Sequence, residues 1–172
     1  MKDNWYAVQV RTGYEQEIVD KCQVLIHKDI LKECFIPRSK RLKKFRGEWK
    51  NVEEILFKGY VFMITDCVDD LYVCLKKIPD LTKILGNDGE YIAPLYDDEV
   101  STLLRYGGSQ HMVDMSYGFI KGDVIHVTSG PLQGQEGQIV KIDRHKRVAY
   151  VDVKLFDRIT RIQVGLEIIS KD

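Results

Sequence analysis

Three stretches of the sequence contain residue types that could bind phosphate. The first is the glycine-rich "GPLQGQEG" at residues 130–137, because loops of this composition can hold phosphates with their backbone amides. The second is the basic stretch at residues 38–50, and the third is "DRHKR" at residues 143–147. Cationic side chains bind the phosphate groups of nucleic acids. The sequence therefore poses a choice between a nucleotide-binding loop and a nucleic-acid surface.

The glycine-rich loop does not match a nucleotide-binding motif. A P-loop requires G-x-x-x-x-G-K-[ST] followed by a helix. Residues 130–137 are followed by "QIVKI", which has strand periodicity, and no Lys-Ser or Lys-Thr follows any of the glycines. The dinucleotide fingerprint G-x-G-x-x-G is also absent. We interpret the loop as a turn in which Pro131 restricts the backbone and the glycines permit positive φ or close backbone approach.

The basic stretch stands out because the chain as a whole has a formal net charge of zero. Residues 38–50 carry seven Lys and Arg side chains against Glu48 alone, a local balance of +6. Such a field attracts phosphate backbones, although a solvated hairpin that keeps the protein soluble has the same composition. Phe45 and Trp49 are candidate stacking platforms for bases, or Trp49 packs across the strand pair. The candidate RNA-binding residues here are Lys43, Lys44 and Arg46.

The second candidate surface for RNA lies in the C-terminal half. Four basic or potentially basic residues follow one another in a predicted turn, with a lysine nearby, and two further arginines could extend the surface. They are Arg144, His145, Lys146 and Arg147, then Lys141, and finally Arg158 and Arg161. Such side chains could grip an RNA backbone, and arginine also stacks on splayed bases. A polar turn without a ligand is the alternative.

Residues that could carry catalysis or bind a metal do not form a recognisable pattern. The four histidines lie on different predicted elements, and the four cysteines are irregularly spaced without a C-x-x-C pair. We expect free thiols, no catalytic site, no metal and no cofactor. The N-terminus lacks the apolar run of a signal peptide, and no stretch approaches the ~20 apolar residues of a membrane span. We therefore expect a cytoplasmic, monomeric, non-enzymatic protein without a membrane partner.

The elements that must position these residues differ between the two halves of the chain. Residues 5–13 have strand character, and apolar residues recur at helical spacing through residue 28. A short strand "CFIP" precedes the basic stretch, which we expect to be a hairpin that reverses at Gly47. The apolar run "GYVFMIT" predicts a central strand, followed by a helix at 68–78, a strand "LTKILG", a turn "NDGE" and a helix at 97–105.

The C-terminal half reads as all-β. Residues 106–118 lack a sustained period, as expected of a linker. Five short apolar runs follow, namely "DVIHV", "GQIVKI", "VAYVDV", "RITRIQV" and "LEII", which together predict a small barrel. We therefore expect an α+β protein with an N-terminal domain at residues 1–106 that has helices on an antiparallel sheet, a linker at 107–117 and an all-β barrel at 118–172.

Two motifs resemble one family in the same order. The stretches "KGDVIHVTSGPLQGQEGQIVKID" and "VKLFDRITRIQVGLEII" resemble a KOW domain, and "WYAVQVRTGYEQ", "LFKGYVFMI" and "IPDLTKILG" resemble the NGN domain of NusG-family transcription factors. The basic hairpin, the Arg-Thr-Gly after the first strand and the compact length are most similar to the specialised LoaP group of antitermination paralogues. Lys58 departs from the family, which commonly has proline before the matching Gly-Tyr.

The resemblance implies roles for particular residues. An NGN domain binds the clamp helices of RNA polymerase through an apolar patch, at positions that match Tyr60, Phe62 and Ile84, although side chains of such a strand are also core candidates. Arg11 matches a position that faces the non-template DNA strand in related paralogues, although an arginine at a strand end is ordinarily only solvated. Phe156 matches a contact to ribosomal or termination partners, or it fills the end of the barrel.

The resemblance implies an elongation and antitermination factor that binds RNA polymerase and a leader RNA hairpin and so suppresses pausing and termination in selected operons. Two alternatives stay open. One is a general NusG-type factor that couples polymerase to the ribosome, through a ribosomal protein, or to a termination factor. The other is a ribosome-associated, RNA-binding structural protein, because KOW barrels occur there as well.

Overall fold

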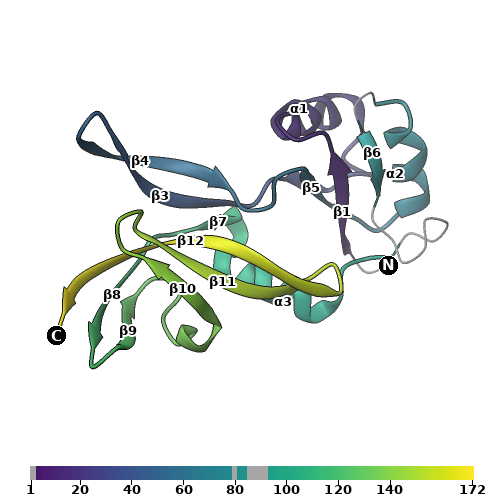
Figure 1. The fold of residues 1–172 in the computed structure, drawn as a ribbon. Helices are drawn as coiled ribbons and strands as arrows, with labels where there is room; N and C mark the ends of the chain where they lie inside the picture. The colour runs from purple at the N-terminus through teal and green to yellow at the C-terminus, as the bar shows by residue number, and fades with distance from the viewer. Residues whose placement is uncertain (1–2, 79–80, 85–92) are drawn as a thin grey trace. The chain divides into compact units, whose positions relative to one another are not determined.

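A computed structural model describes residues 3–78, 81–84 and 93–172, with the backbone alone at 81–84 (Figure 1). The chain divides into two compact units, each assembled from two segments. The N-terminal unit comprises Met1–Ile36 and Phe57–Val100, and the C-terminal unit comprises Pro37–Leu56 and Ser101–Asp172. The hairpin thus groups with the C-terminal strands, whereas the boundaries expected from the sequence leave it in the first domain. Helix α3 (Asp97–Gly107) contains the division.

The N-terminal unit is an antiparallel sheet with helices, in the strand order β2-β5-β1-β6. Its elements are β1 (Asn4–Val10), α1 (Glu15–Leu25), β2 (Glu33–Phe35), β5 (Tyr60–Thr65), α2 (Val68–Leu75) and β6 (Leu81–Ile84). The apolar run that predicted a central strand is β5, which pairs with β1 on one side and with β2 on the other. Ile18, Phe62 and Leu71 are fully buried and form the centre of the core. This part of the α+β prediction is confirmed.

The helices of this unit end earlier than the apolar spacing predicts. Helix α1 ends at Leu25 rather than near residue 28, because Ile26 is already extended at φ −111° and ψ 127°. Helix α2 ends at Leu75, and its C-cap, Lys76, donates its amide to the carbonyl of Tyr72. Apolar spacing continued past both ends because Ile26 and Ile78 are buried outside the helices. The expected turn "NDGE" lies outside the described residues.

The basic stretch forms the predicted hairpin, with β3 (Arg38–Phe45) antiparallel to β4 (Glu48–Ile55). Arg46 and Gly47 between them have φ of 49° and 83°. Positive φ at both central residues defines the tight turn that suits the twist of a two-residue hairpin. The short strand β7 (Met112–Val113) adds parallel to β3 and gives the sheet order β4-β3-β7. Part of the expected linker is therefore a strand.

The remaining strands of the C-terminal unit form one five-stranded sheet, in the order β10-β11-β12-β8-β9. They are β8 (Ser116–Lys121), β9 (Val124–Ser129), β10 (Ile139–Asp143), β11 (Val148–Leu155) and β12 (Arg158–Lys171), with short 3-10 turns η1 (Gly108–Gln110) and η2 (Glu136–Gln138). The predicted all-β character of this region is confirmed. The runs "RITRIQV" and "LEII", expected as two strands, are one continuous strand, β12.

Strand β12 is long because it serves two neighbours. Its first part pairs with β11 up to Gly165, and its second part pairs in parallel with β8 from Leu166 onward. At Gly165 a Cβ atom would lie 2.6 Å from the carbonyl oxygen of Lys40 and 2.2 Å from the sulfur of Met115. Glycine therefore lets other segments of this unit approach the strand at the point where its partner changes.

The glycine-rich loop closes the sheet between β9 and β10 without resembling a phosphate cradle. Gly130 has a φ of 94°, and a Cβ there would lie 2.6 Å from the backbone of Ser116. Leu132 is completely buried, and its amide donates to the Ser116 hydroxyl at 3.0 Å. Both reasons expected for glycine, positive φ and close approach, are therefore found at Gly130.

Candidate functional site

The candidate contacts of the N-terminal unit lie around the end of strand β1, where a buried carboxylate joins two loops. Glu15 is 2% exposed, and its oxygens accept the amides of Gly13 at 2.6 Å and Gly59 at 3.1 Å. Val10 in turn donates its amide to the carbonyl of Gly59 at 2.8 Å. The loop that carries Arg11 is therefore held beside the loop that leads into Tyr60.

Sequence reasoning missed this role of Glu15. The pattern T-x-x-E at residues 12–15 is a helix-start signal that could have drawn attention to it. In the structure the carboxylate accepts from Gly13 rather than from Thr12, and it also reaches the loop before β5. That second contact is forty-four residues away in sequence, so no local pattern could reveal it.

The three residues expected to contact polymerase occupy different environments. Phe62 is completely buried, with its ring centroid 5.7 Å from those of both Phe35 and Phe57. A ring enclosed in this way offers no surface to another protein, so we leave Phe62 out of the interface. Tyr60 is half-buried at the start of β5. Ile84 pairs with Val8 through its backbone, and its side chain lies outside the described part of the structure.

Arg11 is exposed immediately beyond the end of β1. Its guanidinium carbon lies 4.7 Å from the centre of the Tyr14 ring, a cation–π distance. The amide of Tyr14 also donates to the Arg11 carbonyl at 3.0 Å. The side chain is thus supported by its own loop, and its charge remains accessible to a phosphate.

The charges of the hairpin are less available than the count of seven suggests. Arg41 is 4% exposed, and burial lowers the pKa of its guanidinium below the usual range. Lys40 pairs with Asp114 at 3.1 Å, and Lys43 pairs with Glu54 across the hairpin. The exposed cations without an ion pair in the described chain are Lys44, Arg46 and Lys50. The cationic part of the hairpin is therefore its tip.

The basic turn between β10 and β11 is held by hydrogen bonds that leave its cations exposed. Asp143 accepts the amide of Lys146 at 3.0 Å, and this bond lowers the pKa of the carboxyl below its usual range. Arg147 has a φ of 53° and donates its amide to the carbonyl of Arg144 at 3.3 Å. Arg144, His145 and Lys146 are exposed, whereas Arg147 is half-buried. Arg144 and Lys146 therefore form an accessible cationic tip, with the His145 side chain exposed between them.

Of the other expected RNA contacts of this unit, Lys141 lies near the basic turn and acts electrostatically on Asp143, whereas Arg158 and Arg161 of β12 pair with residues further along β11. Phe156 and Asp157 have φ of 57° and 55° and form the turn at the opposite end of β11, next to Arg158. Arg161 is committed to Asp152, to which it donates hydrogen bonds at 2.9 and 3.3 Å. Lys141 is exposed, 5.6 Å from the ring centre of Tyr150. The eight residues of β11 separate the two turns by roughly 23 Å.

The hairpin and the basic turn meet within the C-terminal unit. The guanidinium carbon of Arg147 lies 3.8 Å from the centre of the Trp49 ring, and its Nη1 atom lies 3.4 Å from a carboxylate oxygen of Glu167. Trp49 is half-buried, so the indole packs against this guanidinium. Figure 1 shows the turn between β10 and β11 beside the β3–β4 hairpin. Segments about one hundred residues apart in sequence are therefore neighbours.

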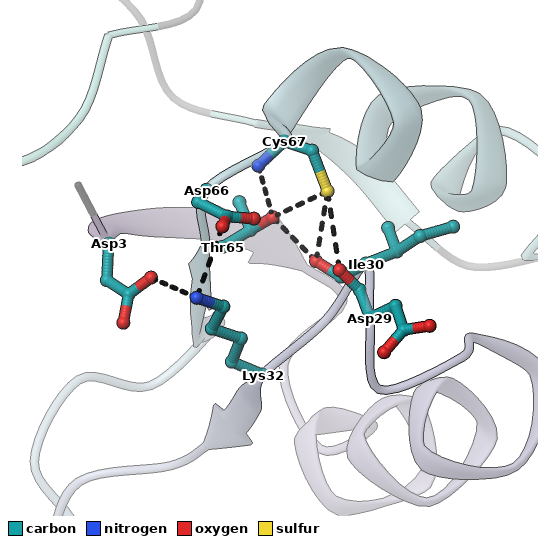
Figure 2. Close-up of polar contacts among 7 residues, drawn as sticks. All are labelled: Asp3, Asp29, Ile30, Lys32, Thr65, Asp66 and Cys67. Carbon is teal, nitrogen blue, oxygen red and sulfur yellow. Dashed lines mark hydrogen bonds and ion pairs between the residues drawn. The ribbon is translucent and has the colours of Figure 1, made fainter. Parts of the chain in front are cut away.

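Three of the four cysteines, Cys22, Cys34 and Cys67, make contacts that support the fold. All four are free thiols, and Cys22 and Cys34 are buried. The hydrogen bond to Cys22, together with burial, raises the pKa of the Cys34 thiol above its ordinary value, so this thiol stays protonated. Figure 2 shows Cys67 at the start of α2, where its amide donates to the Thr65 hydroxyl at 3.0 Å and its thiol faces the carbonyls of Asp29 and Ile30. These contacts are those of structural cysteines.

A lysine beside Cys67 ties together three segments of the N-terminal unit. Lys32 Nζ contacts carboxylate oxygens of Asp3 at 2.5 Å and Asp66 at 3.2 Å (Figure 2). The bond to Asp3, followed by that to Asp66, raises the pKa of this lysine above its usual range. The cluster lies before β1, β2 and α2 and thereby links their starts.

Two further features bear on possible chemistry. Among the described residues, no three His, Cys, Asp or Glu side chains come together as metal ligands. In the same part of the chain, no helix is both long enough and apolar enough to cross a bilayer. The candidate contact sites on the described residues are the hairpin tip, the basic turn, and Arg11 and Tyr60 near the end of β1.

Comparisons with known proteins agree with this arrangement. The family model "Transcription termination factor nusG" matches residues 3–104, and the KOW motif matches residues 121–155. The chain is 27% identical to the transcription termination/antitermination protein NusG of Halalkalibacterium halodurans and 26% identical to that of Bacillus subtilis, with 99% of each chain covered. A Thermotoga maritima NusG structure, described under "Domain interaction", has a TM-score of 0.56 at 24% identity and covers 96% of this chain and 94% of its own. The chain therefore belongs to the NusG family of transcription termination and antitermination factors, with an NGN and a KOW domain.

Proposed function

We propose that this chain is a specialised antitermination factor of the LoaP type. The N-terminal unit binds the clamp helices of RNA polymerase, and the basic residues of the C-terminal unit bind a hairpin in the leader RNA of selected operons. Binding to both suppresses pausing and termination at those operons. The function is non-enzymatic, needs no cofactor and is carried out by a monomer in the cytoplasm.

The observation that carries the RNA part of the proposal is the concentration of exposed cations on a neutral chain. Lys44, Arg46 and Lys50 are exposed near the hairpin tip, and Arg144 and Lys146 are exposed on the basic turn. A protein that bound nucleic acid only indirectly, through polymerase, would not need this segregation of charge. Positive fields of this kind supply the affinity for a phosphate backbone.

The polymerase part of the proposal rests on Tyr60 and Arg11, which lie beside the two loops that Glu15 holds together. Tyr60 is half-buried at the start of the central strand β5, and an aromatic ring with an accessible part is a suitable anchor for helices in a shallow groove. Arg11 lies in the loop tied to the same carboxylate through Gly13. We propose that Tyr60 contacts polymerase and that Arg11 faces the non-template DNA strand, with Ile84 as a further contact.

A general NusG role is the second candidate. Relatives that cover almost the whole chain are named termination/antitermination proteins without reference to selected operons. In this role Phe156, which lies half-buried in the turn at the far end of β11, would contact a ribosomal protein or a termination factor. The two candidates differ in whether the free protein selects particular RNA hairpins.

A panel of RNA hairpins with varied stems and loops separates the two candidates. We expect the purified full chain to bind a subset of the hairpins at moderate salt, by at least about tenfold over the remainder, because base contacts add to the phosphate affinity. Filter binding measures the affinities, and an unstructured RNA of equal length serves as the control. Equal binding to all members would remove the specialised role and favour the general one.

A further inference from the structure

We infer that the hairpin tip and the basic turn form one composite surface for a phosphodiester backbone, and that Trp49 and Arg147 are the residues that position its two halves. This inference rests on the proposed RNA binding and adds where and how the RNA is held. The cationic tip of the hairpin comprises Lys44, Arg46 and Lys50, and that of the turn comprises Arg144 and Lys146, with the exposed His145 between them.

Arg147 connects the basic turn to the hairpin and to β12, and we call its contact with Trp49 the joint. Its guanidinium lies on the Trp49 ring at 3.8 Å, while Nη1 lies 3.4 Å from the Glu167 carboxylate. Its carbonyl accepts the amide of Leu166 at 3.0 Å, so backbone and side chain are both fixed against β12. A charge shared between an indole and a carboxylate is less available to phosphate than its exposed neighbours. Arg147 therefore positions the turn and is not itself a phosphate contact.

The β3–β4 hairpin contacts strand β12 at two further positions. Arg41 donates from Nη1 to the side-chain oxygen of Gln163 at 3.2 Å, and Arg41 is almost completely buried. Two residues further along β12, the absent Cβ of Gly165 leaves room for the carbonyl of Lys40. These contacts, with that of Arg147 to Trp49, hold the hairpin along β12.

The joint brings the two cationic tips to one surface. Trp49 is the cross-strand partner of Lys44, and facing side chains in an antiparallel pair lie about 5 Å apart. Arg147 directly follows Lys146 in the chain. Lys44 therefore faces Trp49 across the hairpin, and Lys146 is next to Arg147 in the chain. Each tip thus has one cation directly beside the contact between Trp49 and Arg147. Fields screened over about 8 Å overlap at such separations, so one backbone can interact with both tips.

The aromatic residues of the hairpin favour RNA over duplex DNA. Trp49 was a candidate platform for bases, but Arg147 occupies a face of its ring. Phe45 is 47% exposed beside the turn of the hairpin and remains free to stack on an unpaired base. Unpaired bases next to a folded backbone are found in the loop of an RNA hairpin, whereas duplex DNA keeps its bases stacked.

The test is the salt dependence of RNA binding in variants that remove the joint but no charge. Trp49→Leu is expected to weaken binding of a selected RNA hairpin about tenfold and to lower the slope of log K against log salt by roughly 1.5, because one tip of about two contacts disengages. Trp49→Phe keeps an aromatic face and should restore both values. Phe45→Leu is the matched control, since it should weaken binding without changing the slope.

Circular dichroism establishes that each variant is folded, and Arg147→Lys provides a second way to weaken the joint, because it keeps the charge but removes the planar guanidinium that lies on the Trp49 ring. An unchanged slope in folded Trp49→Leu and Arg147→Lys, with RNA still bound, would overturn the composite surface while leaving the proposed RNA binding intact. Binding of the parent protein to duplex DNA of equal length is measured in parallel. Tighter binding to DNA than to the RNA hairpin, with the same slope of log K against log salt, would identify DNA as the ligand. A parent protein that binds neither nucleic acid would overturn both the proposed function and the composite surface.

Discussion

Replacing Phe62 with alanine is expected to lower the free energy of unfolding by about 3–5 kcal/mol, because the substitution removes a fully buried ring and leaves a cavity. The ring packs against those of Phe35 and Phe57 in the N-terminal core, so the substitution also removes these two aromatic contacts. Urea unfolding followed by circular dichroism measures the loss. This is one of the two largest effects that we expect.

Tyr60→Ala is the matched comparison two positions earlier on the same strand. Tyr60 is only half-buried, so its removal should cost clearly less stability, about 1–2 kcal/mol, and should leave the fold intact. Binding of the folded variant to purified RNA polymerase should weaken at least tenfold. If Phe62→Ala were as stable as the parent and lost polymerase binding, Phe62 would be a contact residue and our assignment of it to the core would be wrong.

Reversing two charges on the basic turn, with Arg144→Glu and Lys146→Glu, is expected to weaken RNA hairpin binding about a hundredfold. Both side chains are exposed at the tip, and each is expected to neutralise one phosphate. The slope of log K against log salt should fall by about 1.4–1.8, in proportion to the two lost contacts. Fluorescence anisotropy with a labelled hairpin, repeated at several salt concentrations, measures both quantities.

A control with the same change of charge uses two exposed lysines that belong to no proposed contact. Lys28→Glu combined with Lys77→Glu alters residues of the N-terminal unit, whereas the basic turn belongs to the C-terminal unit. The control pair should therefore change affinity only about twofold, and an effect equal to that of the basic turn would mean that net charge alone governs binding.

Local patterns were sufficient to predict most of the elements. Alternation and turn residues predicted the hairpin with its reversal at Gly47, and the continuous apolar run predicted the central strand β5. The mismatch with phosphate-loop motifs led to the interpretation of residues 130–137 as a turn, and the buried Leu132 and positive φ of Gly130 agree with it. Each of these features depends on residues close together in the chain.

Features that depend on distant residues were not predictable from such patterns. The carboxylate of Glu15 reaches Gly59, and the guanidinium of Arg147 reaches Trp49. Phe62 and Tyr60 have similar local sequence signals, and only the packing of the unit separates a buried ring from a half-buried one. Two predicted strands are one strand, β12, because the chain continues through Gly165 while its partner changes from β11 to β8.

Transcription through an intrinsic terminator tests the central claim most directly. Purified polymerase and the full chain are combined on two templates that differ only in whether the leader encodes an RNA hairpin selected from the panel or a scrambled sequence. We predict increased readthrough only on the template with the selected hairpin, and loss of that increase with Arg144→Glu and Lys146→Glu. Equal readthrough on both templates would contradict recruitment by RNA, and the chain would then act as a general NusG factor.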